Sequence, residues 1–483
     1  MITFFVCLSL LIAAYFLYGR FLDRVCRIDP EAEVPSKRLY DGVDYMPMPR
    51  WRVFLIQLLN IAGIGPIFGA VLGACFGPVA FLWITFGGIF LGAMHDYLSG
   101  VIILRNDGRS LPEIVGRYLG GGVRQFMRWF TLLLLILVGV VFLRSPASIL
   151  SEMTGWSNYI WLGIIVVYYF VATLMPIDKI IGKIYPLFGA ALIIMALSLA
   201  GVILFGGYEV PELTSITNAQ SNPAAMPVMP MLFITIACGA ISGFHATQSP
   251  LMARCAGNER ECRSIFYGAM ISESIIALIW AAVAMAFFHG ADGLGASLAE
   301  HGNDAGWAVM TITRTTLGVV GGILAVLGVV AAPITSGDTA FRSARLIVAD
   351  MLHIEQHSIS RRMAVCVPLF AVGIGITFVD FDVIWRYFAW SNQTLAVIVL
   401  WTIVAWLRAE GRSVWIALLP ALFMTYVCSS FVFVSSQFIG MGAQPMAYVY
   451  GGAATAVITA VMIRISRVSA KNGCVPSHAD RKI

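Results

Sequence analysis

Two long apolar stretches of this chain contain glycine, proline and polar residues where an uninterrupted membrane helix would not tolerate them. The first, residues 60–66, reads Asn-Ile-Ala-Gly-Ile-Gly-Pro, and the second, residues 242–248, reads Ser-Gly-Phe-His-Ala-Thr-Gln. Backbone N–H and C=O groups cannot stay unpaired in lipid, so a broken helix persists in a membrane only where it is buried in protein or lines a cavity. Two such breaks at matching positions of two halves of a chain are typical of a transporter binding site.

The composition and the apolar runs of the whole chain predict an all-α integral membrane protein. Of its 483 residues, 59% are hydrophobic and only 12% are charged, against roughly 25% charged residues in soluble domains. Apolar runs of about 17 to 25 residues, the length that crosses the hydrocarbon core as a helix, recur along the sequence. We predict about thirteen spans, near residues 3–18, 52–73, 79–104, 126–143, 159–175, 184–205, 228–247, 265–288, 308–332, 364–379, 384–407, 414–434 and 446–463. Only four residues separate the tenth span from the eleventh, and a re-entrant pair there would change the count.

The positive charges predict the orientation of these spans. With their flanks, the loops on one side hold every lysine and arginine except Arg144, Arg314 and Arg386. Positive residues mark the cytoplasmic side, so we expect the N-terminus outside and the C-terminus in the cytoplasm. The net charge of +5 is therefore topogenic, and we expect membrane lipid and a small-molecule substrate as partners and no nucleic acid. The first span reads as a retained anchor of the cell (inner) membrane rather than a cleaved signal peptide.

The positions of the two breaks predict two inverted groups of five helices. Four unbroken spans separate the broken ones, and a repeat of five helices reverses its direction when it recurs. We therefore expect a first repeat at residues 51–205 and a second at 228–407. Around them we place an anchor helix and cytoplasmic loop at 1–50, two peripheral helices at 413–465 and a cytoplasmic tail at 466–483.

The broken segments hold the candidate substrate-binding residues. Glycine reaches backbone conformations closed to other residues and proline removes a donor, so an unwound turn at Gly63–Pro66 would expose groups for a substrate. The alternative is that these small residues only permit close helix packing. In the second segment, His245 titrates near neutral pH and would carry a proton or meet a substrate carboxylate, unless it is a satisfied core histidine. The expected contacts are Asn60, Gly63, Gly65, Pro66, Ser242, Gly243, His245, Thr247 and Gln248.

Ionisable residues inside predicted spans are candidates for coupling or gating. His95 and Asp96 interrupt the third span and Glu273 lies in the eighth, and such groups are costly enough in a membrane to suggest a function. The alternative for the His95–Asp96 pair is a helix end that reaches water.

A polar cluster follows the predicted ninth span. We expect a break there, then Thr335, Ser336 and Asp338, then a short amphipathic helix in which Arg342 pairs with Asp338. Oxygen ligands suit a small cation, so Thr335 and Ser336 would bind a coupling ion together with the first break at Ala62. The alternative is a capping turn with Ser336 or Asp338 as the N-cap.

Other kinds of chemistry have no sequence support. The chain contains no phosphate-binding glycine loop, no zinc-type ligand spacing and no recognised nucleophile motif. The nine cysteines are scattered, and we expect no disulfide, no structural metal, no catalytic residue and no cofactor other than a coupling H⁺ or Na⁺.

Several of these motifs together resemble the carbon starvation protein A family. They lie between residues 51 and 396 and read Ala-Gly-Ile-Gly-Pro, His-Asp followed by Arg-Asn-Asp-Gly-Arg-Ser-Leu, Ser-Gly-Phe-His-Ala, Asp-Thr-Ala-Phe-Arg-Ser-Ala-Arg and Ser-Asn-Gln-Thr-Leu-Ala. The resemblance implies a five-plus-five inverted-repeat core of the LeuT/APC-like kind and uptake of peptides or pyruvate by nutrient-limited bacteria. The chain is shorter than the family's longer members and differs from them at 247–250, where we expect the substrate.

The sequence thus predicts a secondary active symporter for a small organic nutrient, driven by H⁺ or Na⁺. A channel or a nutrient sensor with the same fold is the second hypothesis. An intramembrane hydrolase that uses His95, Asp96 and His245 is the least favoured, because nothing gives these residues a recognised catalytic spacing.

Overall fold

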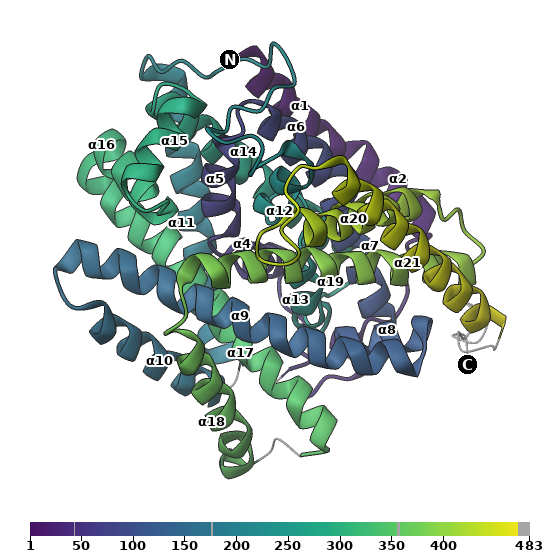
Figure 1. Cartoon of the computed structure of the whole chain (residues 1–483). Helices are drawn as coiled ribbons and strands as arrows, with labels where there is room; N and C mark the ends of the chain where they lie inside the picture. The colour runs from purple at the N-terminus through teal and green to yellow at the C-terminus, as the bar shows by residue number, and fades with distance from the viewer. Residues whose placement is uncertain (43, 175–176, 355–357, 472–483) are drawn as a thin grey trace.

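The computed structural model describes residues 1–42, 44–174, 177–354 and 358–471, and all regular structure in these ranges is helical (Figure 1). Ten helices are long and apolar enough to cross a membrane, or up to eleven if one bent pair counts as a single span. The long helices, or pairs that continue one another, are α1 (Ile2–Phe16) with α2 (Tyr18–Cys26), α6 (Val79–Leu82) with α7 (Met94–Arg105), α9 (Gly121–Thr154), α10 (Asn158–Leu174), α11 (Ile177–Phe205), α14 (Gly268–Phe287), α17 (Ala331–Leu352), α18 (Ile359–Ile376), α19 (Phe381–Ala409), α20 (Trp415–Val434) and α21 (Pro445–Lys471).

Shorter elements connect or extend these helices. They are α3 (Pro35–Arg38), α4 (Arg50–Ala62), α5 (Ala70–Ala74), α8 (Leu111–Leu119), α12 (Phe233–Thr235), α13 (Gly243–Ala253), α15 (Ala291–Glu300), α16 (Ala305–Ala325), the 3₁₀ turn Glu259–Glu261 and the π-helical segments Gly65–Gly69, Trp83–Ala93, Val228–Leu232, Arg263–Tyr267 and Val326–Val330. Eleven of the thirteen expected spans thus correspond to one of the ten long helices or to the bent pair, and two do not. The apolar part of α10 is short, Asn158–Ala172, and the span expected at 228–247 is interrupted.

The first helix break occurs where the sequence predicts it. Helix α4 ends at Ala62, and the next residue, Gly63, has φ 46° and ψ −136°, a conformation that residues other than glycine rarely adopt. The chain resumes as the π-helical turn Gly65–Gly69 and α5, and the two parts meet at 55°. This pair is the span predicted at residues 52–73.

The second break lies earlier than the sequence predicts. Residues 236–242 are non-helical, with Gly239 at φ 92°, whereas the expected break at 242–248 is the first part of α13, apart from Ser242. Gly243 serves close packing, because a Cβ there would lie 2.4 Å from the backbone nitrogen of Ala396. The expectation of an unwound 242–248 segment is therefore wrong from Gly243 onward.

The predicted ninth span, at 308–332, is also displaced. Helix α16 is interrupted at Gly318, with φ 57°, and the long apolar helix runs from Gly321 to Leu352. Pro333 lies inside this helix, just after the π-helical segment Val326–Val330. The expected break and short amphipathic helix are therefore wrong, and neither Ser336 nor Asp338 is a helix cap, since α17 continues through them.

The tenth and eleventh spans are two separate helices, α18 and α19, each long enough to cross a membrane. Helix α9, the third of the first group, packs along α17, its counterpart in the second. Helices α20 and α21 pack against each other and on α19 (Figure 1). The predicted cytoplasmic tail from 466 continues α21 to Lys471, and 472–483 lie outside the described residues.

Candidate functional site

The two helix breaks pack directly against each other. A Cβ added at Gly65 would lie 2.4 Å from both Cβ and Sγ of Cys238, and one at Gly69 would lie 3.1 Å from the carbonyl oxygen of Thr235. Since real Cβ atoms do not approach that closely, glycine is required at Gly65 for contact rather than for an unusual backbone angle. The breaks, about 170 residues apart in the sequence, therefore lie in direct contact.

An aromatic layer covers this junction. The ring of Phe142 on α9 lies over Gly63, where a Cβ would be 2.6 Å from its Cζ. The same ring lies 6.0 Å from that of Phe244 and 6.4 Å from that of Phe388, both edge to face. Three helices, α9, α13 and α19, thus each contribute one ring beside the first break.

Two cavities are lined in part by α9. One, of about 320 Å³, is lined by Thr131 of α9 and Thr247 of α13, with Arg254 among its other residues. Another, of about 380 Å³, is lined by Ser145 of α9 and Trp385 of α19. Phe142 lies between Thr131 and Ser145 in the sequence of α9. A third cavity, of about 430 Å³, is lined by Trp385 and Arg386 among other residues.

The N-terminus of α13 is held by an amide from α19. The side-chain oxygen of Asn392 accepts hydrogen bonds from the hydroxyl of Ser242 at 3.1 Å and from the backbone N–H of Phe244 at 2.7 Å. The next residue, Gln393, donates to the carbonyl oxygen of Phe233 at 3.1 Å. Ser242 therefore bonds within the protein, and Asn392 is the partner that the pattern of the 242–248 segment alone does not reveal.

Three of the expected substrate-contact residues have polar side-chain atoms that lack a hydrogen-bond partner or line a cavity. The buried amide of Asn60 has no hydrogen-bond partner on either of its polar atoms. Thr247 lines the 320 Å³ cavity and accepts a hydrogen bond from the amide of Gln248 at 2.9 Å. The amide oxygen of Gln248 has no partner. Buried polar groups are normally paired, so a ligand is a reasonable partner for these atoms.

Four ionisable residues that lie far apart in the sequence meet in the core. Asp96 accepts from both histidines, with Oδ1 2.8 Å from Nδ1 of His95 and Oδ2 2.8 Å from Nδ1 of His245. Nε2 of His245 lies 3.4 Å from Oε2 of Glu273. All four side chains are 0% exposed, so the alternative of a pair that reaches water from a helix end is wrong for His95 and Asp96. The sequence groups His95, Asp96 and His245 only in the least favoured hypothesis, the hydrolase, and gives no sign that Glu273 joins them.

The polar cluster of α17 reaches the first break. The hydroxyl of Ser336 donates at 3.0 Å to the carbonyl oxygen of Leu59 on α4, and that of Thr335 donates at 2.7 Å to Ala332. Oδ2 of the buried Asp338 accepts from the hydroxyl of Tyr185 at 3.0 Å. Arg342 lies 4.0 Å from the same carboxylate, so the predicted pairing is present within one helix. Tyr185, on α11, is a neighbour that the sequence does not suggest.

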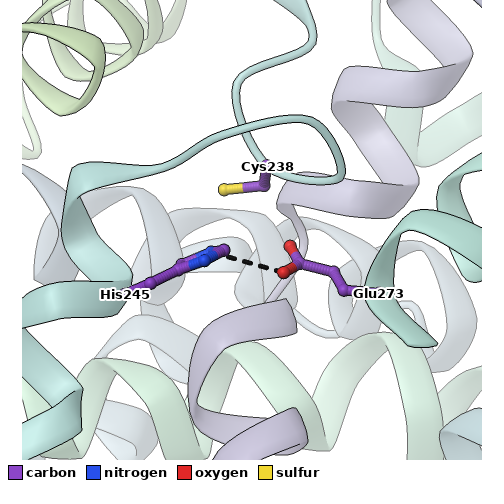
Figure 2. Close-up of side chains that lie close together, drawn as sticks. All are labelled: Cys238, His245 and Glu273. Carbon is purple, nitrogen blue, oxygen red and sulfur yellow. Dashed lines mark ion pairs between the residues drawn. The ribbon is translucent and has the colours of Figure 1, made fainter. Parts of the chain in front are cut away.

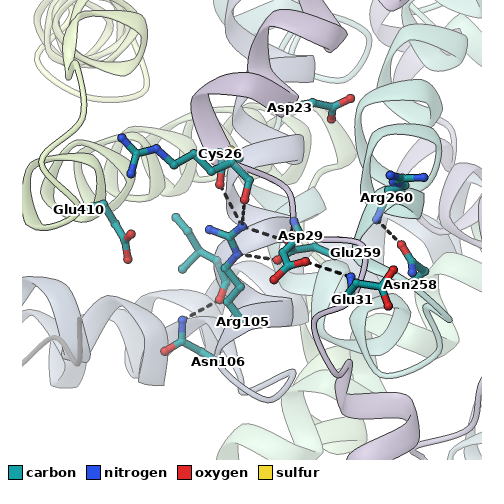
Figure 3. A network of polar contacts seen from close by, with 12 residues as sticks. Asp23, Cys26, Asp29, Glu31, Arg105, Asn106, Asn258, Glu259, Arg260 and Glu410 are labelled. Atoms are coloured by element: carbon teal, nitrogen blue, oxygen red, sulfur yellow. Dashed lines mark hydrogen bonds and ion pairs between the residues drawn. The ribbon is translucent and has the colours of Figure 1, made fainter. Parts of the chain in front are cut away.

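A buried ion pair ties the N-terminal segment to the core (Figure 3). Arg105 at the end of α7 donates to Glu259 at 2.5 and 3.1 Å and to the carbonyl oxygen of Cys26 at 2.9 Å. Glu259 also accepts from the backbone N–H of Asp29 at 2.6 Å. The side chains of Arg105 and Glu259 are 4% and 2% exposed, which makes this an internal link between α2, α7 and the segment that leads into α14.

Known proteins resemble this chain in sequence over more than half its length. An uncharacterized membrane protein of Haemophilus influenzae is 43% identical over 339 residues, covering 60% of this chain and 91% of that protein. The peptide transporter CstA of Escherichia coli is 27% identical over 340 residues, covering 57% of this chain and 48% of that protein. The pyruvate/proton symporter BtsT of Escherichia coli is 26% identical over 335 residues, covering 56% and 47%. The chain therefore spans about half the length of these two named transporters.

Solved structures resemble it in fold. The transporter MhsT in complex with L-phenylalanine has a TM-score of 0.55 at 15% identity, covering 88% of this chain and 99% of that one. Mhp1, a nucleobase-cation-symport-1 family transporter, has a TM-score of 0.53 at 15% identity, covering 89% and 94%. Both have the LeuT-type five-plus-five fold, which confirms the predicted fold class.

A family match covers the region of the sequence that contains both helix breaks. The family described as carbon starvation protein CstA matches residues 1–157 and 144–320. These ranges include α4, α7, α13 and α14, and hence the junction of the breaks and the buried ionisable cluster. The chain therefore belongs to the carbon starvation protein CstA family.

Proposed function

We propose that this protein is a secondary active symporter that imports a small organic nutrient, such as pyruvate or a short peptide, across the cytoplasmic membrane. The observation that carries the proposal is the packing of two helix breaks against each other, Gly65 on Cys238, inside a fold of the LeuT type. Broken helices of this kind hold substrate and ion in such transporters. The family and its two named transporters support the nutrient class.

The substrate path that we propose runs through the two cavities on α9. The aromatic layer of Phe142, Phe244 and Phe388 is the barrier between them, and its movement would open one side at a time. Asn60, Thr247 and Gln248 are the first candidates for substrate contact, because Asn60 and Gln248 keep unpaired buried atoms and Thr247 faces a cavity. The charge distribution supports an extracellular N-terminus and a cytoplasmic C-terminus, with Arg254 on the inner side and Arg386 on the outer.

The coupling ion, in this proposal, binds where α17 meets the end of α4. Ser336 already reaches the carbonyl oxygen of Leu59, and backbone carbonyls at Ala62 together with the hydroxyls of Thr335 and Ser336 would give Na⁺ the oxygen ligands that hard cations take. If the ion is a proton, the buried carboxylate of Asp338 is the group that would carry it. The cluster of His95, Asp96, His245 and Glu273 joins α7, α13 and α14, and we propose that it gates the movement of these helices.

Uptake by proteoliposomes tests the proposal. The purified full-length chain is reconstituted, and entry of labelled pyruvate and of a labelled dipeptide is followed under an imposed pH gradient and, separately, under a Na⁺ gradient. Concentrative uptake under one gradient, abolished by an ionophore, supports symport and identifies the ion. Binding without flux would favour a nutrient sensor, and flux that never exceeds equilibration would favour a channel.

A further inference from the structure

The three side chains of Cys238, His245 and Glu273 point at one another from separate elements (Figure 2). Cys238 belongs to the non-helical segment 236–242, His245 to α13 and Glu273 to α14. All three are buried, and one atom of each, Sγ, a ring nitrogen and a carboxylate oxygen, lies within 4.8 Å of the other two. These are three of the ligand types that first-row transition metals take in proteins.

The facing atoms are poorly satisfied for buried polar atoms. Nε2 of His245 forms an ion pair with Glu273 at 3.4 Å, but neither this nitrogen nor either carboxylate oxygen makes a well-formed hydrogen bond. Besides these two groups, Sγ of Cys238 has Ser242 at 3.7 Å and Asn392 at 3.9 Å as polar neighbours. A buried polar group without a well-formed hydrogen bond costs about 1–3 kcal/mol, and more when it is charged. Three such groups that converge on one point make a candidate site for a cation.

Asp96 orients His245 as metal-binding histidines are held. Its Oδ2 lies 2.8 Å from Nδ1 of His245, and a carboxylate accepts, so Nδ1 carries a hydrogen. Nε2 faces Glu273, and a metal that binds there takes the place of any proton on Nε2. A carboxylate behind a histidine is the usual arrangement of metal-binding histidines, because it fixes the ring and raises its basicity. Asp96 is in this way a positioning residue for the site.

We propose that Cys238, His245 and Glu273 bind one divalent transition-metal ion, with Zn²⁺ as the first candidate. Bonds of ~2.0–2.3 Å in a tetrahedral site place ligand atoms about 3.3–3.6 Å apart, and Nε2 of His245 and Oε2 of Glu273 already lie 3.4 Å apart. The Sγ atom lies within 4.8 Å of both other ligand atoms and must come closer to them to complete the set. A divalent cation also offsets the negative charge of two carboxylates, Asp96 and Glu273, within the membrane core.

The bound ion would fix the second helix break. It would join the non-helical segment 236–242 to α13 and α14, and through Asp96 to α7, and three protein ligands leave a fourth coordination position for water or an anionic group. The sequence alone predicts no metal, because the ligands lie on elements whose separation in the chain matches no metal-binding motif. This inference does not depend on the proposed transport activity, and the experiments that test it measure metal binding and stability instead of transport.

Metal content of the purified full-length protein tests the proposal. We expect stoichiometric metal by mass spectrometry after growth with trace Zn²⁺, Mn²⁺, Fe²⁺ and Co²⁺, and at least roughly tenfold less in the variants Cys238→Ser, His245→Ala and Glu273→Gln. The matched control is Cys428→Ser, another buried cysteine on α20, which should retain the metal. Asp96→Asn should bind, but about 10–100-fold more weakly in competition with a chelating dye.

Cobalt substitution and thermal unfolding provide readouts that do not depend on a variant that folds poorly. In wild type, Co²⁺ should give visible d–d bands and a sulfur-to-cobalt charge-transfer band, with the latter lost in Cys238→Ser. Chelation should lower the Tm of wild type and added Zn²⁺ should restore it. The proposal is overturned if wild type holds only trace metal and gives no cobalt spectrum, if His245→Ala holds as much as wild type, or if chelation leaves Tm unchanged.

Discussion

At the scale of single residues, Glu212 shows how one side chain from a long loop caps a distant helix. Its carboxylate accepts from the backbone N–H groups of Ile2 and Thr3 at 2.6 and 2.8 Å, and from the hydroxyl of Thr3 at 2.6 Å. It also pairs with the amine of Met1. The Met1 amine and then Thr3 lower the pKa of Glu212 from 4.5 to about 2. The free N–H groups that begin α1 are thus satisfied from residue 212.

Glu212→Gln should therefore destabilise the protein by about 1 kcal/mol at neutral pH, the usual size of a lost cap. Because the folded pKa lies below the unfolded one, the stabilisation is present above about 4.5 and is lost as the pH falls toward about 2. Thermal unfolding in detergent between pH 7 and pH 3 should show the variant and wild type converging at low pH. The exposed Glu209, changed to Gln, is the control and should follow wild type throughout; a constant gap for Glu212→Gln would contradict the charge effect.

Thr335 is the residue that tests the proposed ion site. Thr335→Ala removes one hydroxyl ligand, and we expect about tenfold weaker cation activation of uptake, equivalent to ~1.4 kcal/mol. Thr335→Ser keeps the hydroxyl and should restore activation. Thr316→Ala on α16 is the matched control, since its hydroxyl also bonds only to a carbonyl of its own helix, Ile312 at 2.7 Å. Equal loss in both alanine variants would argue against an ion at α17.

At the scale of elements, contact between the two breaks depends on the absence of a side chain at Gly65. Gly65→Ala would force a methyl group to within 2.4 Å of Cys238, so we expect about 1–3 kcal/mol of destabilisation and loss of uptake. Gly163→Ala on α10 is the control, because a Cβ there meets nothing within 4 Å. Tm and uptake are measured for both. Unchanged uptake by a folded Gly65→Ala protein would show that the junction tolerates separation.

The buried Arg105–Glu259 pair should be a strong link between elements. Glu259→Gln leaves the Arg105 guanidinium without its counter-charge, and breaking a buried pair costs about 3–5 kcal/mol. The exposed pair between Arg38 and Asp107 offers the comparison, for which Asp107→Asn should cost about 0–1 kcal/mol. Thermal unfolding of both variants measures the difference. Similar small effects would mean that water reaches the internal pair.

At the scale of the whole molecule, the proposed barrier of Phe142, Phe244 and Phe388 predicts two cavities that are reached from opposite sides. Ser343 of α17 lines one cavity and Ser148 of α9 another, and both side chains are partly exposed, while the eight native cysteines of the described residues are buried. With an impermeant thiol reagent, Ser148→Cys should react in intact cells and Ser343→Cys only in inverted vesicles. Adding Phe142→Ala should make Ser343→Cys reactive from outside. Reactivity of both single variants from the same side would refute the separation, and reversed sides would refute the orientation.

The sequence by itself determined the class of the protein, most of its apolar helices, the site of the first break and the fold class. Hydrophobic length and charge bias are local properties, so they can be read from a single segment. Gly63, which directly follows α4, is likewise a local signal that can be read from its own segment.

Only the tertiary structure decided what lies next to what. The second break lies at residues 236–242, because Asn392 supports the start of α13 at Gly243. Thr335 and Ser336 lie inside a helix, α17, which packs on α4. The tertiary structure also brought Cys238 beside His245 and Glu273. Such long-range contacts depend on how the helices cross, and no periodicity within one segment records that.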